Sequence, residues 1–199
     1  MSKTPLILAS GSSARQNMLR NAGIDFDIIP ADIDEEKIIQ NCESCLLDKK
    51  DTVLKLAEEK ALSVSKNNPE NYIVGSDQIL VMDDRIFNKA NNRDEAKERL
   101  KNFQGKSHSL MSAVCVALNN EVIWSTVDTA RLYVKKMNEK QIDHYMNQAG
   151  EALTKCVGGY AIEGPGIRLF KEIEGDFFTI MGMPLLLLLN YLEKESVLS

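Results

Sequence analysis

Residues 6–15 read LILASGSSAR. The first four are apolar, which is typical of a short buried strand, and a loop of glycine and serine follows them. Ser13 and Gln16 have the spacing of a capping box, in which two side chains satisfy backbone N–H groups at the start of a helix. We therefore predict a helix from about Ala14 to Gly23, and this strand–loop–helix unit indicates an α/β fold.

Strands and helices continue to alternate along the rest of the chain. An apolar stripe predicts a helix from about Asp51 to Lys66. A central strand is predicted over 72–81, interrupted at 75–78. The other predicted elements are a strand over 24–28, helices opening at Asn92 and Asn138, a hairpin of 110–118 and 122–134, and a helix after Pro184. Since no repeat or linker breaks this pattern, we expect one domain over 1–199 with a mixed sheet flanked by helices.

Composition excludes several classes of protein. The chain has 199 residues, 44% hydrophobic and 27% charged, which excludes a disordered or low-complexity protein. Its net charge of -5 argues against binding nucleic acid by general electrostatics. We see neither a secretory signal nor the ~20 apolar residues of a membrane span, so we expect a cytoplasmic protein with reduced cysteines. Cys42 and Cys45 lack a second pair at zinc-like spacing and are interpreted as spectators.

The serine-rich loop after the first strand is a candidate phosphate site. Ser10 and Ser12 are small enough for backbone N–H groups to approach an anion, and a helix N-terminus adds partial positive charge. Arg15 can form two hydrogen bonds with phosphate oxygens. The loop matches neither GxxxxGK[ST] nor GxGxxG, and a capped helix with a solvated arginine remains an alternative.

Two charged residues occupy positions where apolar residues are expected. Lys60 lies on the apolar stripe of its helix, where it either reaches past the edge of the core or meets an anion. Asp77 lies in a strand that should be central, and a carboxylate there needs a cation, a metal or an open cleft. Glu35, in an acidic turn, and Lys89 are weaker candidates, since such residues are usually solvated. Together these acids and cations suit metal-assisted cleavage of a phosphoanhydride.

Several ordered motifs resemble those of the Maf family of septum-formation proteins and nucleoside triphosphate pyrophosphatases. The opening LASGSSAR is similar to the family's LASxSPRR, and the likeness continues nearly to the end of the chain. The other stretches are EKA (59–61), GSDQ (75–78, family GADT), NKA (88–90, GKP), FQGKSH (103–108, LSGKxH), GGYAIEG (158–164, AGxYxIQG) and IEGDFFTIMGMP (173–184, IxGDYxxVxGLP).

The resemblance implies an elongated, curved sheet in two lobes around a central cleft, as in inosine triphosphate pyrophosphatases. It implies hydrolysis of a nucleoside triphosphate, including modified or non-standard ones, to the monophosphate and diphosphate with Mg²⁺ or Mn²⁺. Asp77 would be the general base, a metal ligand, or both, and Glu35 would help to place the metal. A homodimer is a further family-level expectation. The substrate and its phosphates would be bound by Ser10, Ser12, Arg15, Lys60, Gln78, Lys89 and Glu163.

Four departures from the family motifs bear on this site. Ala14 and Ser13 replace an arginine and a proline, and Gln78 and Glu163 replace a threonine and a glutamine. Losing a guanidinium and an amide donor affects substrate identity more than reaction type, because Asp77, Lys60 and Lys89 remain. Two alternatives stay open: a non-catalytic nucleotide-binding regulator of septum formation, and a nucleotidyltransferase.

Overall fold

The computed structural model describes residues 6–198, which form two compact units built from discontinuous segments. Unit 1 contains the described parts of Met1–Gln78, Met111–Asp128 and Gly182–Ser199. Unit 2 contains Ile79–Leu110 and Thr129–Met181. Three long strands contribute residues to both units: β3 (Tyr72–Met82), β5 (Ser107–Leu118) and β6 (Glu121–Val134). The prediction of one domain over 1–199 and of a cleft between lobes stays a prediction.

The strands form one mixed seven-stranded sheet, as predicted. Its order is β2-β1-β3-β5-β6-β7, with β4 paired to β3. β1 runs parallel to β2 and β3, whereas β4 is antiparallel to β3 and β7 is antiparallel to β6. The shorter strands are β1 (Leu6–Leu8), β2 (Asp27–Ile28), β4 (Arg85–Phe87) and β7 (Phe170–Glu174).

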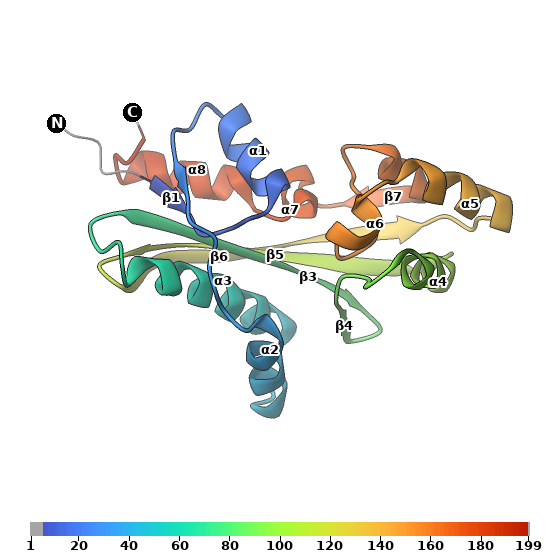
Figure 1. Cartoon of the computed structure of the whole chain (residues 1–199), viewed down its shortest axis with the longest axis horizontal. Coiled ribbons are helices and arrows are strands. Elements are labelled where there is room, and N and C mark those ends of the chain that lie inside the picture. Colours follow the sequence, from blue (N-terminus) through green and yellow to red (C-terminus); the bar gives the residue numbers. More distant parts are fainter. Residues whose placement is uncertain (1–5, 199) are drawn as a thin grey trace. The chain divides into compact units, whose positions relative to one another are not determined.

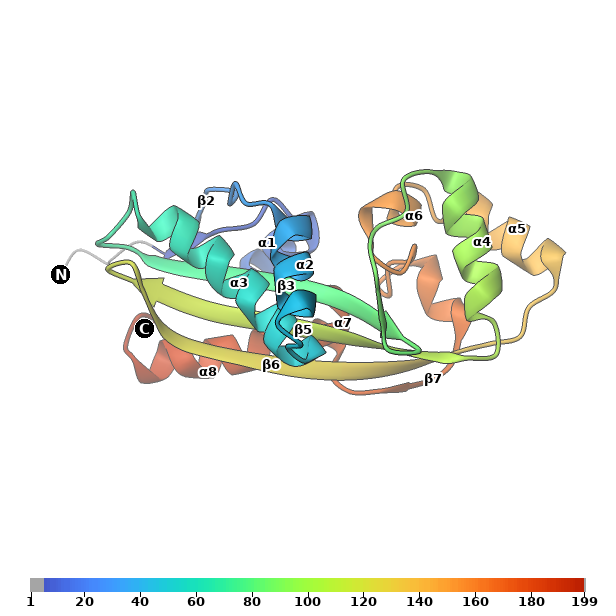
Figure 2. The same ribbon diagram turned by 90° about the horizontal axis from the view of Figure 1, so that it is seen from below.

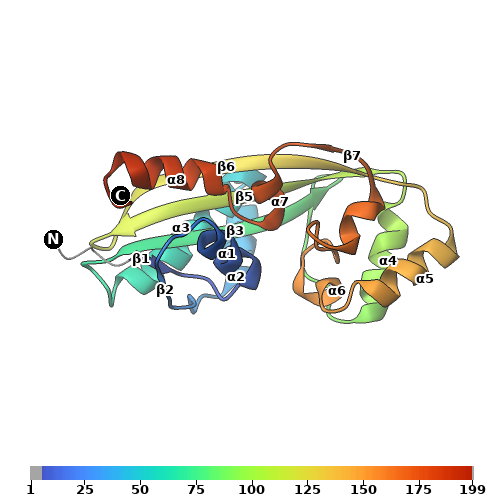
Figure 3. The same cartoon turned by 90° about the horizontal axis from the view of Figure 1, so that it is seen from above.

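In unit 1, helices cover both faces of the strands. Helices α2 and α3 lie on one face, and α1 and α8 lie on the other (Figures 1 and 3). Leu185, Leu188 and Leu192 of α8 are buried at the spacing of one helix face. Tyr191 of this helix stacks on Trp124 of β6 with ring centroids 4.6 Å apart. The helices of this unit are α1 (Ser13–Asn21), α2 (Glu35–Ser44), α3 (Lys49–Ser65) and α8 (Leu185–Lys194).

Close packing between α3 and β3 depends on Gly75. A Cβ atom at this position would lie 2.2 Å from the carbonyl oxygen of Ala57 and 2.8 Å from the Cβ atom of Ala61. Only glycine therefore lets the helix backbone approach the strand this closely. The approach brings the buried face of α3 directly over the middle of β3.

Unit 2 has its own hydrophobic core, formed by residues of β3, β5, β6, α4, α5 and the following segments. Helix α4 contacts α5 and α6, and the three lie together in Figure 2. Inside this core, the imidazole of His108 is 1% exposed and its Nε2 atom lies 2.5 Å from the hydroxyl of Tyr160. The remaining elements are α4 (Arg93–Phe103), α5 (Glu139–Gln148), α6 (Ala152–Lys155), the 3-10 helix η1 (Pro165–Leu169) and α7 (Phe177–Met181).

Several local predictions were wrong in informative ways. β3 is continuous, because the glycine predicted to interrupt it accommodates α3 instead. The acidic turn is the first turn of α2, where Asp34 caps the helix and Glu35 and Glu36 suit its positive end. The side chain that caps α1 belongs to Ser12, not to Ser13.

The strand predicted over 24–28 shortens to the two residues of β2. The hairpin is confirmed, with Asn119 and Asn120 at φ 52° and 62° in its turn. Within residues 6–198, no helix combines the length and the apolar character needed to cross a bilayer.

Candidate active site

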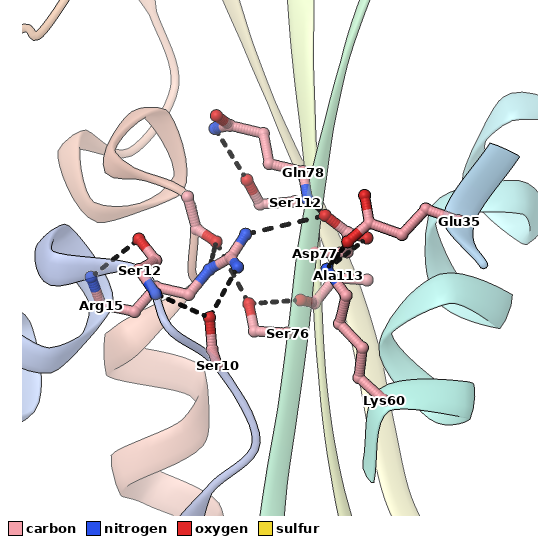
Figure 4. A network of polar contacts seen from close by, with 11 residues as sticks. Ser10, Ser12, Arg15, Glu35, Lys60, Ser76, Asp77, Gln78, Ser112 and Ala113 are labelled. Atoms are coloured by element: carbon pink, nitrogen blue, oxygen red, sulfur yellow. Dashed lines mark hydrogen bonds and ion pairs between the residues drawn. The ribbon is translucent and has the colours of Figure 1, made fainter. Parts of the chain in front are cut away.

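Asp77 is the centre of a buried polar cluster in unit 1 (Figure 4). Asp77 is 7% exposed. One of its carboxylate oxygens, Oδ1, accepts a hydrogen bond of 2.7 Å from the backbone N–H of Gln78. The other oxygen, Oδ2, lies 2.9 Å from Nζ of Lys60. Oδ2 is nevertheless buried without a well-aligned hydrogen bond, so this ion pair supplies charge while leaving the oxygen free to accept another proton or ligand.

Lys60 points into this cluster from α3 and does not reach past the edge of the core. Its ammonium lies 2.7 Å from Oε1 of Glu35 as well as 2.9 Å from Asp77. Lys60 and Asp77 are each 7% exposed, so water screens the charges of this pair weakly, whereas the side chain of Glu35 is 52% exposed. The buried lysine thus meets two anions, and its phosphate-binding role stays a prediction.

Arg15 enters the cluster from α1. Its Nε donates a 2.9 Å hydrogen bond to the carbonyl oxygen of Gly182, and Nη1 donates a 3.1 Å bond to the hydroxyl of Ser10. Nη2 lies 3.9 Å from Asp77 Oδ1. These two hydrogen bonds use only two of the five N–H groups of the guanidinium, so donors remain for an anion.

The charge of Arg15 is set by opposing influences. Burial lowers its pKa, and the negative charges of Asp77 and Glu35 raise it. An arginine starts with a pKa so high that the guanidinium stays protonated in a protein. Arg15 therefore remains a fixed cation beside the carboxylate of Asp77.

The serine loop is ordered around this arginine. Ser12 caps α1 by accepting a hydrogen bond from the backbone N–H of Arg15, and the backbone N–H of Ser12 donates to the hydroxyl of Ser10. Gln78, on the strand beside Asp77, donates from Nε2 to the hydroxyl of Ser112 at 3.0 Å. The structure thus gathers six of the residues selected from sequence around Asp77, namely Ser10, Ser12, Arg15, Glu35, Lys60 and Gln78.

Three residues of the cluster were missed by the sequence analysis. Ser76 donates to the carbonyl of Ala113 at 2.8 Å, and its hydroxyl also lies 3.1 Å from the carbonyl oxygen of Gly182. Ser112 and Gly182 reach the cluster from β5 and from the segment before α8. Ser112 lies in an apolar strand and carries no distinctive signal. Ser76 and Gly182 lie in the motifs over 75–78 and 173–184, but a motif match alone does not predict their contacts.

Lys89 and Glu163 belong to unit 2, and both are exposed. They interact electrostatically with one thiol: burial raises the pKa of Cys156, the charge of Glu163 raises it further, and that of Lys89 lowers it. Arg99 anchors the segment before Lys89 by donating to the carbonyls of Asn88 and Val157. The nucleotide- and phosphate-binding roles of Lys89 and Glu163 stay predictions.

The side chains around Asp77 are of the type that Mg²⁺ or Mn²⁺ prefers, and metal binding here stays a prediction. Asp77 and Glu35 direct carboxylate oxygens toward the same point from two elements, where they share the ammonium of Lys60. Oδ2 of Asp77 retains the acceptor capacity described above. Among residues 6–198, no group of three or more His, Cys, Asp or Glu side chains could hold a metal ion. Two carboxylates are what Mg²⁺ commonly uses when substrate phosphates supply further oxygens.

Comparison with known proteins identifies the family of this chain. The model of the family described as Maf-like protein matches residues 5–195. The nucleoside triphosphate pyrophosphatase of Bradyrhizobium diazoefficiens is 45% identical, with 99% of this chain and 96% of the relative covered. That of Granulibacter bethesdensis is 42% identical, with 98% of each covered. The 7-methyl-GTP pyrophosphatase of Brucella suis is 40% identical, with 96% of each covered. The chain belongs to the Maf family.

Proposed function

We propose that this protein is a nucleoside triphosphate pyrophosphatase, which hydrolyses a nucleoside triphosphate to the monophosphate and diphosphate. The observation that carries the proposal is the buried carboxylate of Asp77, 2.9 Å from the ammonium of Lys60 and adjacent to the guanidinium of Arg15. This arrangement provides a proton acceptor beside two fixed cations. The names of the relatives from Bradyrhizobium diazoefficiens and Brucella suis support the same reaction.

In the proposed reaction, a water molecule attacks the anhydride between the α- and β-phosphates. The water oxygen forms the new P–O bond, the bond to the diphosphate breaks, and the carboxylate of Asp77 accepts the water proton. Lys60 and the free N–H groups of Arg15 stabilise the negative charge that develops on phosphate oxygens. Because both cations are already fixed by Ser10, Glu35 and Gly182, little reorganisation accompanies this charge development.

A divalent metal ion held by Glu35 and Asp77 would neutralise phosphate charge when it is bound. In the structure, the ammonium of Lys60 lies between these two carboxylates, and Oδ2 of Asp77 has no well-aligned hydrogen bond. Asp77 thus serves as proton acceptor, metal ligand or both.

The substrates that we propose include modified or non-standard nucleotides, so that the enzyme removes unwanted triphosphates. The relatives' names support this range, since one names nucleoside triphosphates in general and another names 7-methyl-GTP. Glu163 is the residue through which we propose that this chain selects its base. No particular base is assigned.

The test is product analysis with a panel of natural and methylated triphosphates and either Mg²⁺ or Mn²⁺. We expect equimolar monophosphate and diphosphate. Asp77→Asn should lower kcat by about 100- to 10,000-fold while nucleotide binding persists. Asp25→Asn, which changes an exposed aspartate of unit 1, should leave kcat unchanged.

Release of orthophosphate alone would refute the pyrophosphatase assignment. Nucleotide binding without turnover would support the regulator. A requirement for a second acceptor substrate would identify a nucleotidyltransferase.

A further inference from the structure

Unit 2 contains a cavity of about 440 Å³ at the junction of three segments. The segments are the end of β6 with the residues that follow it, one face of α5, and η1. A volume of this size suits a small-molecule ligand. None of the residues that line the cavity belongs to the Asp77 cluster. They are Lys135, Lys136, Met137, Asn138, Lys140, Gln141, His144, Tyr145, Gln148, Pro165, Arg168 and Leu169.

Hydrogen bonds fix the backbone that surrounds this cavity. The N–H of Lys135 donates to the carbonyl of Leu169 at 2.8 Å, and the N–H of Met137 donates to Oε1 of Gln104 at 2.8 Å. Asn138 and Gln141 form a complete capping box at the start of α5. The walls are therefore ordered before any ligand arrives, which lowers the entropy cost of binding.

The lining is strongly cationic and contains no carboxylate. Lys135, Lys136, Lys140 and Arg168 contribute four positive charges. Within residues 6–198, none of these four side chains forms an ion pair with an acidic residue, although eight other basic side chains do. In a chain with a net charge of -5, such a concentration of uncompensated positive charge is a local feature that composition does not explain.

Two of these cations are positioned by the surrounding backbone. The ammonium of Lys135 donates to the carbonyl of Arg168 at 3.1 Å, which ties the end of β6 to η1 on the rim of the cavity. The stem of Lys136 lies over Gly105, where a Cβ atom would be 3.2 Å from its Cγ and Cε atoms. Both side chains are exposed, so their remaining N–H groups are accessible to a ligand.

We propose that this cavity binds a small phosphorylated anion. Arg168 can hydrogen-bond two phosphate oxygens at once, while the lysines supply point charges and His144 and Gln148 supply further polar groups. Buried Tyr145 and Leu169 provide apolar surface beside them. Two kinds of ligand carry such a phosphate group, namely inorganic diphosphate and a nucleotide. This proposal does not depend on the proposed catalytic function.

Nucleic acid is the less favoured ligand for this cavity. Proteins that bind nucleic acid through charge present cations along a strip that follows successive phosphates. Here the cations surround a single concave volume of about 440 Å³, and the whole chain is acidic. A compact anion can pair with these cations inside the cavity and leaves fewer of them unpaired than an extended nucleic acid would.

The test is a titration of the full-length protein without divalent cations, followed by amide chemical shifts. The three probes are inorganic diphosphate, inorganic phosphate and adenosine monophosphate, each at constant ionic strength. We expect saturable shifts in residues 135–144 and 165–169. A stronger response to diphosphate than to adenosine monophosphate identifies the inorganic source, and the reverse order identifies a nucleotide.

Charge-removing variants connect these shifts with the cavity. Lys140→Gln and Arg168→Gln should each raise the dissociation constant at least about tenfold, because each removes a charge-assisted hydrogen bond. Lys155→Gln is the matched control, since Lys155 is an exposed lysine of unit 2 that pairs with Glu151 and does not line the cavity. Shifts near Asp77 report any separate binding there and should be the same in all variants.

Three results would overturn the proposal. One is an unchanged dissociation constant in the folded Lys140→Gln/Arg168→Gln double variant. Another is the same response to sulfate as to phosphate at equal ionic strength. The third is tighter binding of a single-stranded oligonucleotide than of all three small anions, which would identify a nucleic-acid surface.

Discussion

The ammonium of Lys60 lies 2.9 Å from Oδ2 of Asp77, and both residues are 7% exposed. The same ammonium contacts Glu35 at 2.7 Å, so a single lysine compensates two carboxylates. Removing one partner of a buried ion pair leaves an uncompensated charge, which is more costly than the pair is stabilising. Lys60 therefore contributes both to the stability of unit 1 and to the charge of the site.

Replacement of Lys60 should separate these contributions. In Lys60→Gln we expect kcat to fall at least about 100-fold, because a fixed cation no longer faces the developing negative charge. The free energy of unfolding should fall by about 3 kcal/mol. Lys55→Gln is the control, since Lys55 lies on the same helix and makes an exposed pair with Glu59. Unchanged kinetics in Lys60→Gln would exclude an electrostatic role for this residue.

Gly182 is expected to be intolerant of a side chain because of its positive φ, and its carbonyl oxygen holds Arg15. Its φ is +110°, and a Cβ atom there would lie 3.5 Å from Nη2 and 3.6 Å from Nε of Arg15. Gly182→Ala should cost about 1–3 kcal/mol of stability through backbone strain and should also raise KM, because the carbonyl that holds Arg15 moves.

Gly23→Ala is the matched control for this variant. Gly23 has φ +74° but nothing within 4 Å of the added atom, so only the strain should appear. Equal kinetic effects in both variants would show that Arg15 is not held through Gly182. Unfolding by denaturant and initial rates provide the two measurements.

Glu35 should affect activity mainly through the metal ion. In Glu35→Gln we expect the concentration of Mn²⁺ that gives half-maximal rate to rise about tenfold or more, since one of two carboxylates is lost. Glu36→Gln changes the next residue of α2, which is exposed, and should leave this concentration unchanged. A rate loss that excess metal does not reverse would instead indicate that Glu35 acts through Lys60.

His108 should make the protein less stable in acid. Burial lowers the pKa of His108 from 6.5 to about 4, so between these values the unfolded chain binds a proton that the folded chain does not. Stability is therefore fully present above about pH 6.5 and should fall by about 3 kcal/mol as the pH approaches 4.

The contribution of His108 can be isolated by substitution. His108→Gln keeps a polar partner for Tyr160 and should remove this part of the pH dependence, whereas His144→Gln, at an exposed site, should not. Denaturant unfolding at several pH values measures the difference. An identical slope in His108→Gln and the unmodified protein would contradict the assignment.

The strongest site predictions came from residues whose chemistry conflicts with their place in a periodic pattern. A lysine on an apolar stripe and an aspartate inside a central strand each require a partner, and Lys60 and Asp77 prove to be partners of each other. The mixed sheet was predicted from a different signal, the alternation of strands and helices along the chain. Such conflicts can be recognised from sequence because burial of an unpaired charge is costly.

Other parts of the site depend on approaches between distant segments. Ser112 and Gly182 are ordinary residues for a strand and a loop, and only the fold brings them to Gln78 and Arg15. Gly75 was read as an interruption of its strand, because one sequence does not indicate that α3 will pack against it. Glu35 lies in the first turn of α2, at the positive end of this helix, although the sequence of this segment resembles a turn.

The division of the chain has a practical consequence for anyone who wishes to dissect the molecule. The backbone passes from one unit to the other at 78/79, 110/111, 128/129 and 181/182, so neither unit corresponds to a continuous fragment that can be expressed alone. The first of these crossings, between Gln78 and Ile79, lies one residue beyond Asp77. Truncating or dividing the chain there would cut β3 beside the proposed proton acceptor. The activity of either unit therefore has to be measured in the intact polypeptide, with substitutions and not with fragments.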